Sequence, residues 1–205
     1  KADIVLVSDT SMISMETPSI ESGLRGLAYM EVEVVGPNRD LHSGVYGGAV
    51  ANPATILCQM IASLHDENNH ITIPGFYDKV QELSKAERDA INAAPFSLDE
   101  YKKDLGVNEI WGEKGYTTLE RTGIRPTLEV NGIWGGYTGE GAKTVLPSTA
   151  HAKFSTRLVA DQDWRDIEAQ VRAHCKKHLP PDIEWDLIVH SGGPGAIMDR
   201  KSKYM

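Results

Sequence analysis

Cysteine and basic residues are both scarce in this chain of 205 residues. It contains two cysteines, Cys58 and Cys175, with no paired spacing and each in a helix-like pattern. That usage predicts reduced packing residues in a cytoplasmic protein rather than a disulfide framework. Lys and Arg total 21 against 29 Asp and Glu, a formal net charge of −8. This balance, without any basic run, argues against nucleic acid or an anionic membrane as a partner.

Long apolar runs and a leader sequence are also missing. No apolar stretch approaches the roughly 20 residues that a membrane-spanning helix needs. The chain opens with KADIVLVSD, which is strand-like at once and shows none of the progression of a signal peptide. A buried-type strand at the very start, and DRKSKYM at the end, predict a piece of a longer chain.

Hydrophobic periodicity predicts two kinds of strand near the start. Residues 4–8, IVLVS, form a continuous apolar run typical of a strand buried on both faces of a parallel sheet. No βαβ pattern follows, so its sheet is expected elsewhere. Residues 27–35 instead alternate, with Glu31 and Glu33 on one face, as in a half-buried antiparallel strand. Asn52 followed by proline then predicts the capped start of an amphipathic helix.

The remaining elements complete a recognisable order. Residues 74–122 are interpreted as an insertion with short helices over 77–94 and after Ser97, which caps the second. Strands are predicted at 127–136, 150–159 and 183–190, with one further helix capped by Asp163. Without the insertion the order is β-α-β-β-α-β. This order predicts an α+β, ferredoxin-like domain, with two helices on one face of a four-stranded antiparallel sheet.

Two motifs resemble ligand-binding sequences but lack residues that such sites require. In the glycine-rich stretch 135–144, an alanine separates the last glycine from Lys143, and VLP follows instead of a helix start. A phosphate-binding loop is therefore excluded, and a flexible loop or a substrate-contacting loop both remain open. In HCKKH, His174 and His178 have the spacing of a zinc pair but no adjacent glutamate. We expect a solvated, cationic helix end there.

Four single residues are candidates that chemistry alone leaves open. His42 lies in DLHSGVYGG among small residues, which suits a turn, a ligand, or a group presented outside this chain. Arg157 belongs to the polar face of its strand and is either solvated or a clamp for a carboxylate. His190 lies at a strand end. Asp9 follows the buried strand and is either a turn cap or a metal ligand.

Several long motifs together resemble one family. DLHSGVYGG, NGIWGGYTGEGAKTVLPSTAHAKFSTRLV and the SD that ends the first strand occur in the order seen in the zinc metallopeptidases that include aminoacylases, carboxypeptidase G and carnosinases. The resemblance is greatest to the branch of carnosinases and cytosolic nonspecific dipeptidases, and it covers nearly the whole chain. It implies that residues 23–195 are the lid, or dimerisation, domain. Residues 1–22 would end a catalytic-domain strand, and 196–205 would return to that domain.

The resemblance also implies roles for the candidates. His42 would reach across a homodimer interface and stabilise the oxyanion formed when zinc-bound hydroxide attacks a dipeptide. Thr144 would contact substrate from the same partner, Arg157 would bind the substrate's C-terminal carboxylate, and His190 would be a further substrate-binding residue. Asp9 would be one ligand of two zinc ions, which this chain alone is not expected to hold because a lone carboxylate cannot make such a site.

The resulting expectation is a fragment of a di-zinc dipeptidase, inactive by itself. An alternative of another class stays open, namely a stand-alone ferredoxin-like module that binds a small molecule or dimerises without catalysis. Flanking sequence distinguishes the two, because the enzyme requires His-x-Asp and Glu-Glu motifs upstream and a zinc-ligand histidine downstream. Neither of these two motifs occurs within the chain.

Overall fold

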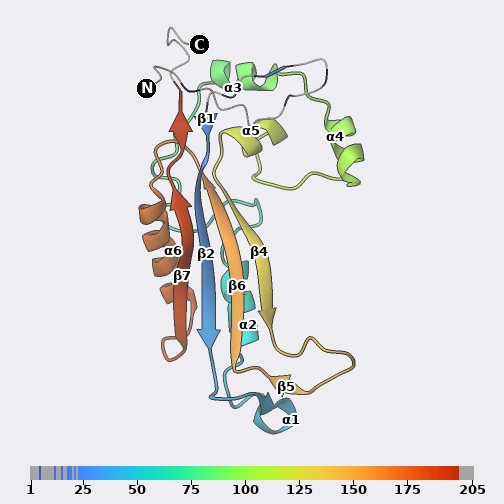
Figure 1. Cartoon of the computed structure of the whole chain (residues 1–205), viewed down its shortest axis with the longest axis vertical. Helices are drawn as coiled ribbons and strands as arrows, with labels where there is room; N and C mark the ends of the chain where they lie inside the picture. Colours follow the sequence, from blue (N-terminus) through green and yellow to red (C-terminus); the bar gives the residue numbers. More distant parts are fainter. Residues whose placement is uncertain are drawn as a thin grey trace.

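Four long antiparallel strands make up the central sheet of the computed structural model, which describes residues 23–198 and, before them, residues 5, 12, 15, 18, 19 and 21. The strand order is β4-β6-β2-β7 (Figure 1). The four strands are β2 (Gly26–Val35), β4 (Thr127–Gly135), β6 (Thr149–Leu158) and β7 (Glu184–Gly193). The predicted half-buried strand and the three later ones are therefore present.

One face of this sheet is the core and the other is open. Along β2 and β6, buried and half-buried or exposed residues alternate, as the period of a strand requires. The buried face packs against α2 (Pro53–Ala62) and α6 (Trp164–His178), which contact each other as well as the sheet. Both helices begin where the sequence predicts, because the side chains of Asn52 and Asp163 accept hydrogen bonds from the first-turn N–H groups.

Short strand pairs lie at the two ends of the sheet. At one end, β1 (Gly23–Leu24) pairs with β8 (Ala196–Ile197). At the other end, β3 (Leu41–His42) pairs with β5 (Val145–Leu146), next to the single-turn helix α1 (Ser43–Tyr46). Figure 1 shows β1 and the β5–α1 tip at opposite ends of the long axis.

The helices between α2 and β4 lie at the β1 end of the sheet (Figure 1). They are α3 (Lys85–Asn92), α4 (Leu98–Leu105) and α5 (Thr118–Gly123). Ser97 caps α4 as predicted. The helix predicted over 77–94 is too long, because Ser84 caps α3 through a reciprocal bond pair with Glu87 and so fixes its start at Lys85.

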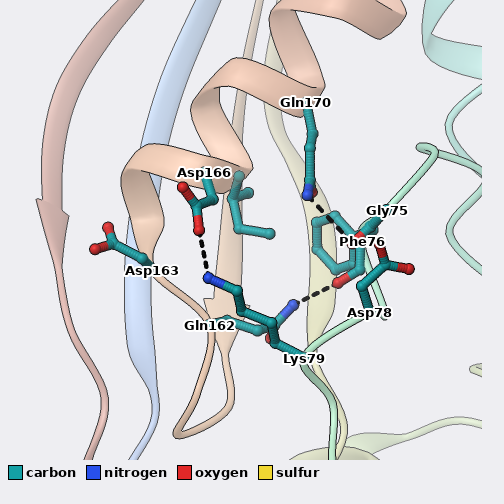
Figure 2. Close-up of a pocket in the computed structure, with 9 residues that line it drawn as sticks. Gly75, Phe76, Asp78, Lys79, Gln162, Asp163, Asp166 and Gln170 are labelled. Carbon is teal, nitrogen blue, oxygen red and sulfur yellow. Dashed lines mark hydrogen bonds and ion pairs between the residues drawn. The ribbon is translucent and has the colours of Figure 1, made fainter.

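The residues before α3 are held instead by α6 and by Gln162, which lies just before that helix. Gln162 and Gln170 donate to the carbonyl oxygens of Phe76 and Gly75 at 2.7 and 3.2 Å. Lys79 pairs with Asp166 at 2.6 Å (Figure 2). These groups enclose a cavity of only about 80 Å³, and its polar atoms serve mainly to fasten this segment to the helix.

Two expectations about packing are wrong. Cys58 is exposed on α2, while Cys175 is buried in the core, where burial raises the pKa of its thiol to about 12. His174 is buried rather than solvated, because its position on α6 faces α2, where Ser63 hydrogen-bonds its Nε2 at 2.9 Å. Burial, followed by the charges of His178 and Lys177, lowers the pKa of His174 to about 4.

The strand predicted at residues 4–8 lies outside the described residues, apart from Val5. Within the described part of the chain, no helix combines the length and apolar character needed to cross a membrane.

Candidate functional site

The two motif loops that carry His42 and Thr144 are joined at the tip of the sheet. β3 pairs with β5, and the backbone N–H of Ser43 donates to the Thr144 carbonyl at 3.0 Å. The Asp40 carboxylate accepts a hydrogen bond from the N–H of Ser148 at 2.9 Å. The side chains of His42 and Thr144, which are 102 positions apart, meet at 3.1 Å between Nε2 and Oγ1. Both residues are exposed.

The backbone around His42 fixes which ring nitrogen carries the proton. Nδ1 accepts a hydrogen bond from the N–H of Gly44 at 2.9 Å, so Nδ1 is unprotonated and the neutral ring has its proton on Nε2. In this tautomer the exposed ring donates its Nε2–H to the hydroxyl oxygen of Thr144. A larger residue at position 44 would displace the ring, since a Cβ at Gly44 would lie 2.8 Å from His42 Cε1. Small residues in this loop thus serve the position of the histidine.

Arg157 and His190 lie together with the polar residues of the open sheet face. Arg157 is exposed near the end of β6, beside Leu27 of β2. Among the described residues, no hydrogen bond or ion pair occupies its guanidinium group. His190, on β7, is 37% exposed at its side chain and bonds Glu31 at 2.9 Å. A planar guanidinium without an internal partner suits bidentate binding of a carboxylate.

The sequence pattern places Glu31 on a polar strand face but indicates no role for it. Its carboxylate has a side-chain exposure of 12% and is approached by three basic side chains from the two neighbouring strands. These are His190 at 2.9 Å, His151 at 3.5 Å and Lys153 at 3.6 Å. The alternation along residues 27–35 indicated the face, but only the pairing of β2 with β6 and β7 shows which cations meet the carboxylate.

The tip and the open-face residues are far apart along the sheet. Arg157 is the penultimate residue of β6, whereas Thr144 precedes the start of that strand at Thr149. Eight residues of extended strand cover roughly 26 Å. The structure therefore brings His42 to Thr144, and separates both from Arg157.

The glycine-rich stretch and HCKKH form neither a phosphate loop nor a metal site among the described residues. After the glycine-rich stretch 135–144 the chain continues as β5 and not as a helix, in agreement with the exclusion of a phosphate loop. The rings of His174 and His178 stack at 4.2 Å, with His174 buried as described above. Asp9 lies outside the described residues. Across residues 23–198 and the six described before them, no three His, Cys, Asp or Glu side chains are grouped to hold a metal ion.

Comparison with known proteins identifies the family of this chain. The family model described as "Peptidase dimerisation domain" matches residues 22–183, which include β2, β4, β6, both packed helices and the tip, and end just before β7. The chain belongs to this family. The match covers three of the four long strands as well as the segment with α3, α4 and α5.

The relatives of this dimerisation domain include dipeptidases. The Cys-Gly metallodipeptidase dug1 of Schizosaccharomyces pombe is 37% identical over 86% of the chain and 37% of its own length. The Beta-Ala-His dipeptidase of Homo sapiens is 35% identical over 84% of the chain and 34% of its own length. The crystal structure of human carnosine dipeptidase 1 superposes with a TM-score of 0.78 at 31% identity, covering 89% of the chain and 39% of that structure. The chain thus spans less than half the length of these relatives.

Proposed function

We propose that this chain is the dimerisation, or lid, domain of a di-zinc dipeptidase that acts as a homodimer in the cytoplasm. In this proposal residues 23–195 form the domain, with an insertion over about 74–122. Residues 1–22 and 196–205 lead from and to a catalytic domain. The strand order β4-β6-β2-β7, with α2 and α6 as crossovers, supports a ferredoxin-like assignment of the sheet.

One observation carries the proposal: the two groups of candidate residues lie at different ends of one rigid sheet. A single dipeptide is far shorter than the roughly 26 Å of strand between Arg157 and the tip. One subunit therefore does not bring His42 and Arg157 to the same substrate. In a symmetric dimer the tip of each subunit contributes to its partner's site, and the open face contributes to its own.

The chemistry of the tip suits stabilisation of an oxyanion. His42 offers a neutral Nε2–H donor, held by the bond from Gly44 to Nδ1. A fixed donor aimed at the oxygen that becomes negative in a tetrahedral intermediate lowers the barrier by about 3 kcal/mol. Thr144, whose hydroxyl is 3.1 Å from Nε2, completes the contact made from the partner side.

The open face suits recognition of the substrate's ends. Arg157 would bind the free C-terminal carboxylate, and His190 would contact another part of the dipeptide. The described residues do not fit a zinc site, because no three potential ligands are grouped. The metal ligands, with Asp9 among them, therefore belong to the part of the enzyme beyond the described residues.

Subunit mixing in the full-length enzyme tests the proposal. His42→Ala and Arg157→Ala are each expected to abolish most activity as homodimers. In a heterodimer of the two, one site has an intact Arg157 from its own subunit and an intact His42 from the partner. With random mixing, half of the dimers are heterodimers, and one of the two sites in each heterodimer is intact. Activity should therefore return to about a quarter of the wild-type value.

A matched control uses two residues of the same tip. A mixture of His42→Ala with Thr144→Ala should regain no activity, because both residues serve the same partner site and every heterodimer site lacks one of them. Recovery in this control, or none in the first mixture, would contradict the assignment of the tip to the partner's site. An enzyme without metal-dependent dipeptide hydrolysis would contradict the activity itself.

A further inference from the structure

Glu31 occupies the centre of the open sheet face, where it bridges three strands. One carboxylate oxygen, Oε2, lies 2.9 Å from His190 Nε2 on β7 and 3.6 Å from Lys153 Nζ on β6. The other, Oε1, lies 3.5 Å from His151 Nδ1, also on β6. Contacts from both sides hold the carboxylate in one position, and only 12% of the side chain is exposed. Glu31 is thus a fixed acceptor on an otherwise solvated face.

The backbone of β7 is irregular at the residue that Glu31 contacts. Tyr29 of β2 is opposite Ser191, whereas Met30, the next residue, is opposite Val189. His190 is therefore the extra residue of a β-bulge. Such bulges re-aim a side chain and are over-represented next to active sites. Here the bulge sets the imidazole against the Glu31 carboxylate, with the Tyr29 ring 5.7 Å away.

The protonation of this pair follows from the groups around it. Burial raises the pKa of Glu31, but the hydrogen bond from His190 and the charges of Lys153, His190 and His151 outweigh it and lower that pKa overall. The carboxylate is then ionised at neutral pH and can only accept. The proton in the 2.9 Å contact consequently belongs to His190 Nε2. No described residue bonds the other ring nitrogen, Nδ1.

We propose that Glu31 is a positioning residue that holds the His190 ring through Nε2 and leaves Nδ1 as the ring atom available to substrate. The inference rests on the proposed function, in which His190 contacts the dipeptide, and adds the group that orients it. Without Glu31 the ring would exchange between its two tautomers and between orientations. Substrate would then bind only to the fraction of molecules in which Nδ1 is correctly placed. The effect should therefore appear in KM more than in kcat.

Variants of the full-length enzyme test this inference. Glu31→Met removes the acceptor at similar size and should raise KM about tenfold, the loss of one charge-assisted hydrogen bond, with kcat changed less than about twofold. Glu31→Gln keeps an acceptor oxygen and should restore most of the lost affinity. The matched control is Glu33→Met, two residues along the same face, whose carboxylate contacts His151 at 3.8 Å but not His190. It should leave KM near the wild-type value.

Two further measurements separate positioning from general damage. In a His190→Ala background, Glu31→Met should have no additional effect on KM. In ¹⁵N-histidine-labelled enzyme, the His190 signals should report protonated Nε2 in wild type and a mixture of tautomers in Glu31→Met. As pH falls and the carboxylate is protonated, the wild-type KM should approach that of Glu31→Met. His151, Lys153 and His190 all influence that titration, and Glu33 faces it through its contact with His151.

Each result has a distinct meaning. If His190→Ala raises KM while Glu31→Met does not, the positioning role is wrong and the proposed function stands. If both variants raise KM additively in the double variant, Glu31 does not act through His190 and the inference is likewise overturned. If the wild-type enzyme hydrolyses no dipeptide, the proposed function fails. An unchanged tautomer signal in Glu31→Met would overturn the Glu31–His190 coupling whatever the activity.

Discussion

Replacement of Glu120 by glutamine should destabilise the segment with α3, α4 and α5, because a buried carboxylate organises it. Glu120 is fully buried. It accepts hydrogen bonds from Arg88 Nε at 2.6 Å, Arg88 Nη2 at 3.0 Å and the backbone N–H of Thr117 at 2.8 Å. Asn92 donates a fourth bond at 3.2 Å. A glutamine would turn one acceptor oxygen into an NH₂ group facing these donors.

The expected loss of stability follows from how deeply Glu120 and Arg88 are buried. Removing one partner of a buried ion pair costs about 3–5 kcal/mol, and the 37% exposure of Arg88 places this pair at or below the lower limit. The pKa gives a second measure. The Arg88 hydrogen bonds, opposed by burial and aided by Thr117, lower the pKa of Glu120 from 4.5 to about 2. That difference corresponds to about 3 kcal/mol before the exposed guanidinium is allowed for. We expect a loss of about 2–3 kcal/mol.

The pH dependence has a defined sign. The folded-state pKa lies below the unfolded value, so the stabilisation is complete above about pH 4.5 and is lost as pH falls toward about 2. Urea denaturation of the purified chain at pH 7 and at pH 3, for wild type and Glu120→Gln, measures both effects. The two proteins should differ most at pH 7, and the difference should be roughly halved at pH 3, because the folded-state pKa of Glu120 is about 2.

The control is Glu109→Gln, an exposed glutamate of the same segment. It should change the free energy of unfolding by less than about 0.5 kcal/mol. A Glu120→Gln protein as stable as this control at pH 7, or a difference that persists unchanged at pH 3, would refute the argument from the buried carboxylate.

Three other predictions concern the tip, the thiols and the open face. Gly44→Ala should lower kcat of the full-length enzyme about 100-fold with its metal content intact, since the new Cβ displaces the His42 ring; unchanged kcat would show that the ring position is unimportant. In the native chain, a thiol reagent at pH 8 should label Cys58 and reach Cys175 only after unfolding, because Cys175 is buried and the pKa of its thiol is raised to about 12. Arg157→Lys should weaken hydrolysis of dipeptides with a free C-terminus far more than of amidated ones, because a lysine loses bidentate geometry; equal losses would mean that Arg157 only faces solvent.

Local patterns in the sequence were sufficient to predict the elements of the sheet. Alternation over residues 27–35 and 150–159 specified strands, and Asn52 and Asp163 specified helix starts, because both signals act over a few neighbouring residues. The too-long helix at 77–94 shows the limit of such signals. Its apolar residues fit a helical period. Hydrogen bonds from Gln170 of α6, and from Gln162 just before it, nevertheless hold the chain ahead of α3 in a non-helical conformation.

The sequence by itself determined the candidate residues and the family that their motifs resemble, because long motifs in order identify a family without any coordinates. The tertiary structure decided how those residues are grouped. Strand pairing placed Thr144 against His42, and separated both from Arg157, across positions too distant in the chain for any local pattern to relate. It also gave Glu31 its three basic neighbours and buried His174 against Ser63. A residue's environment depends on side chains contributed by other elements, and only the folded sheet and its helices specify those.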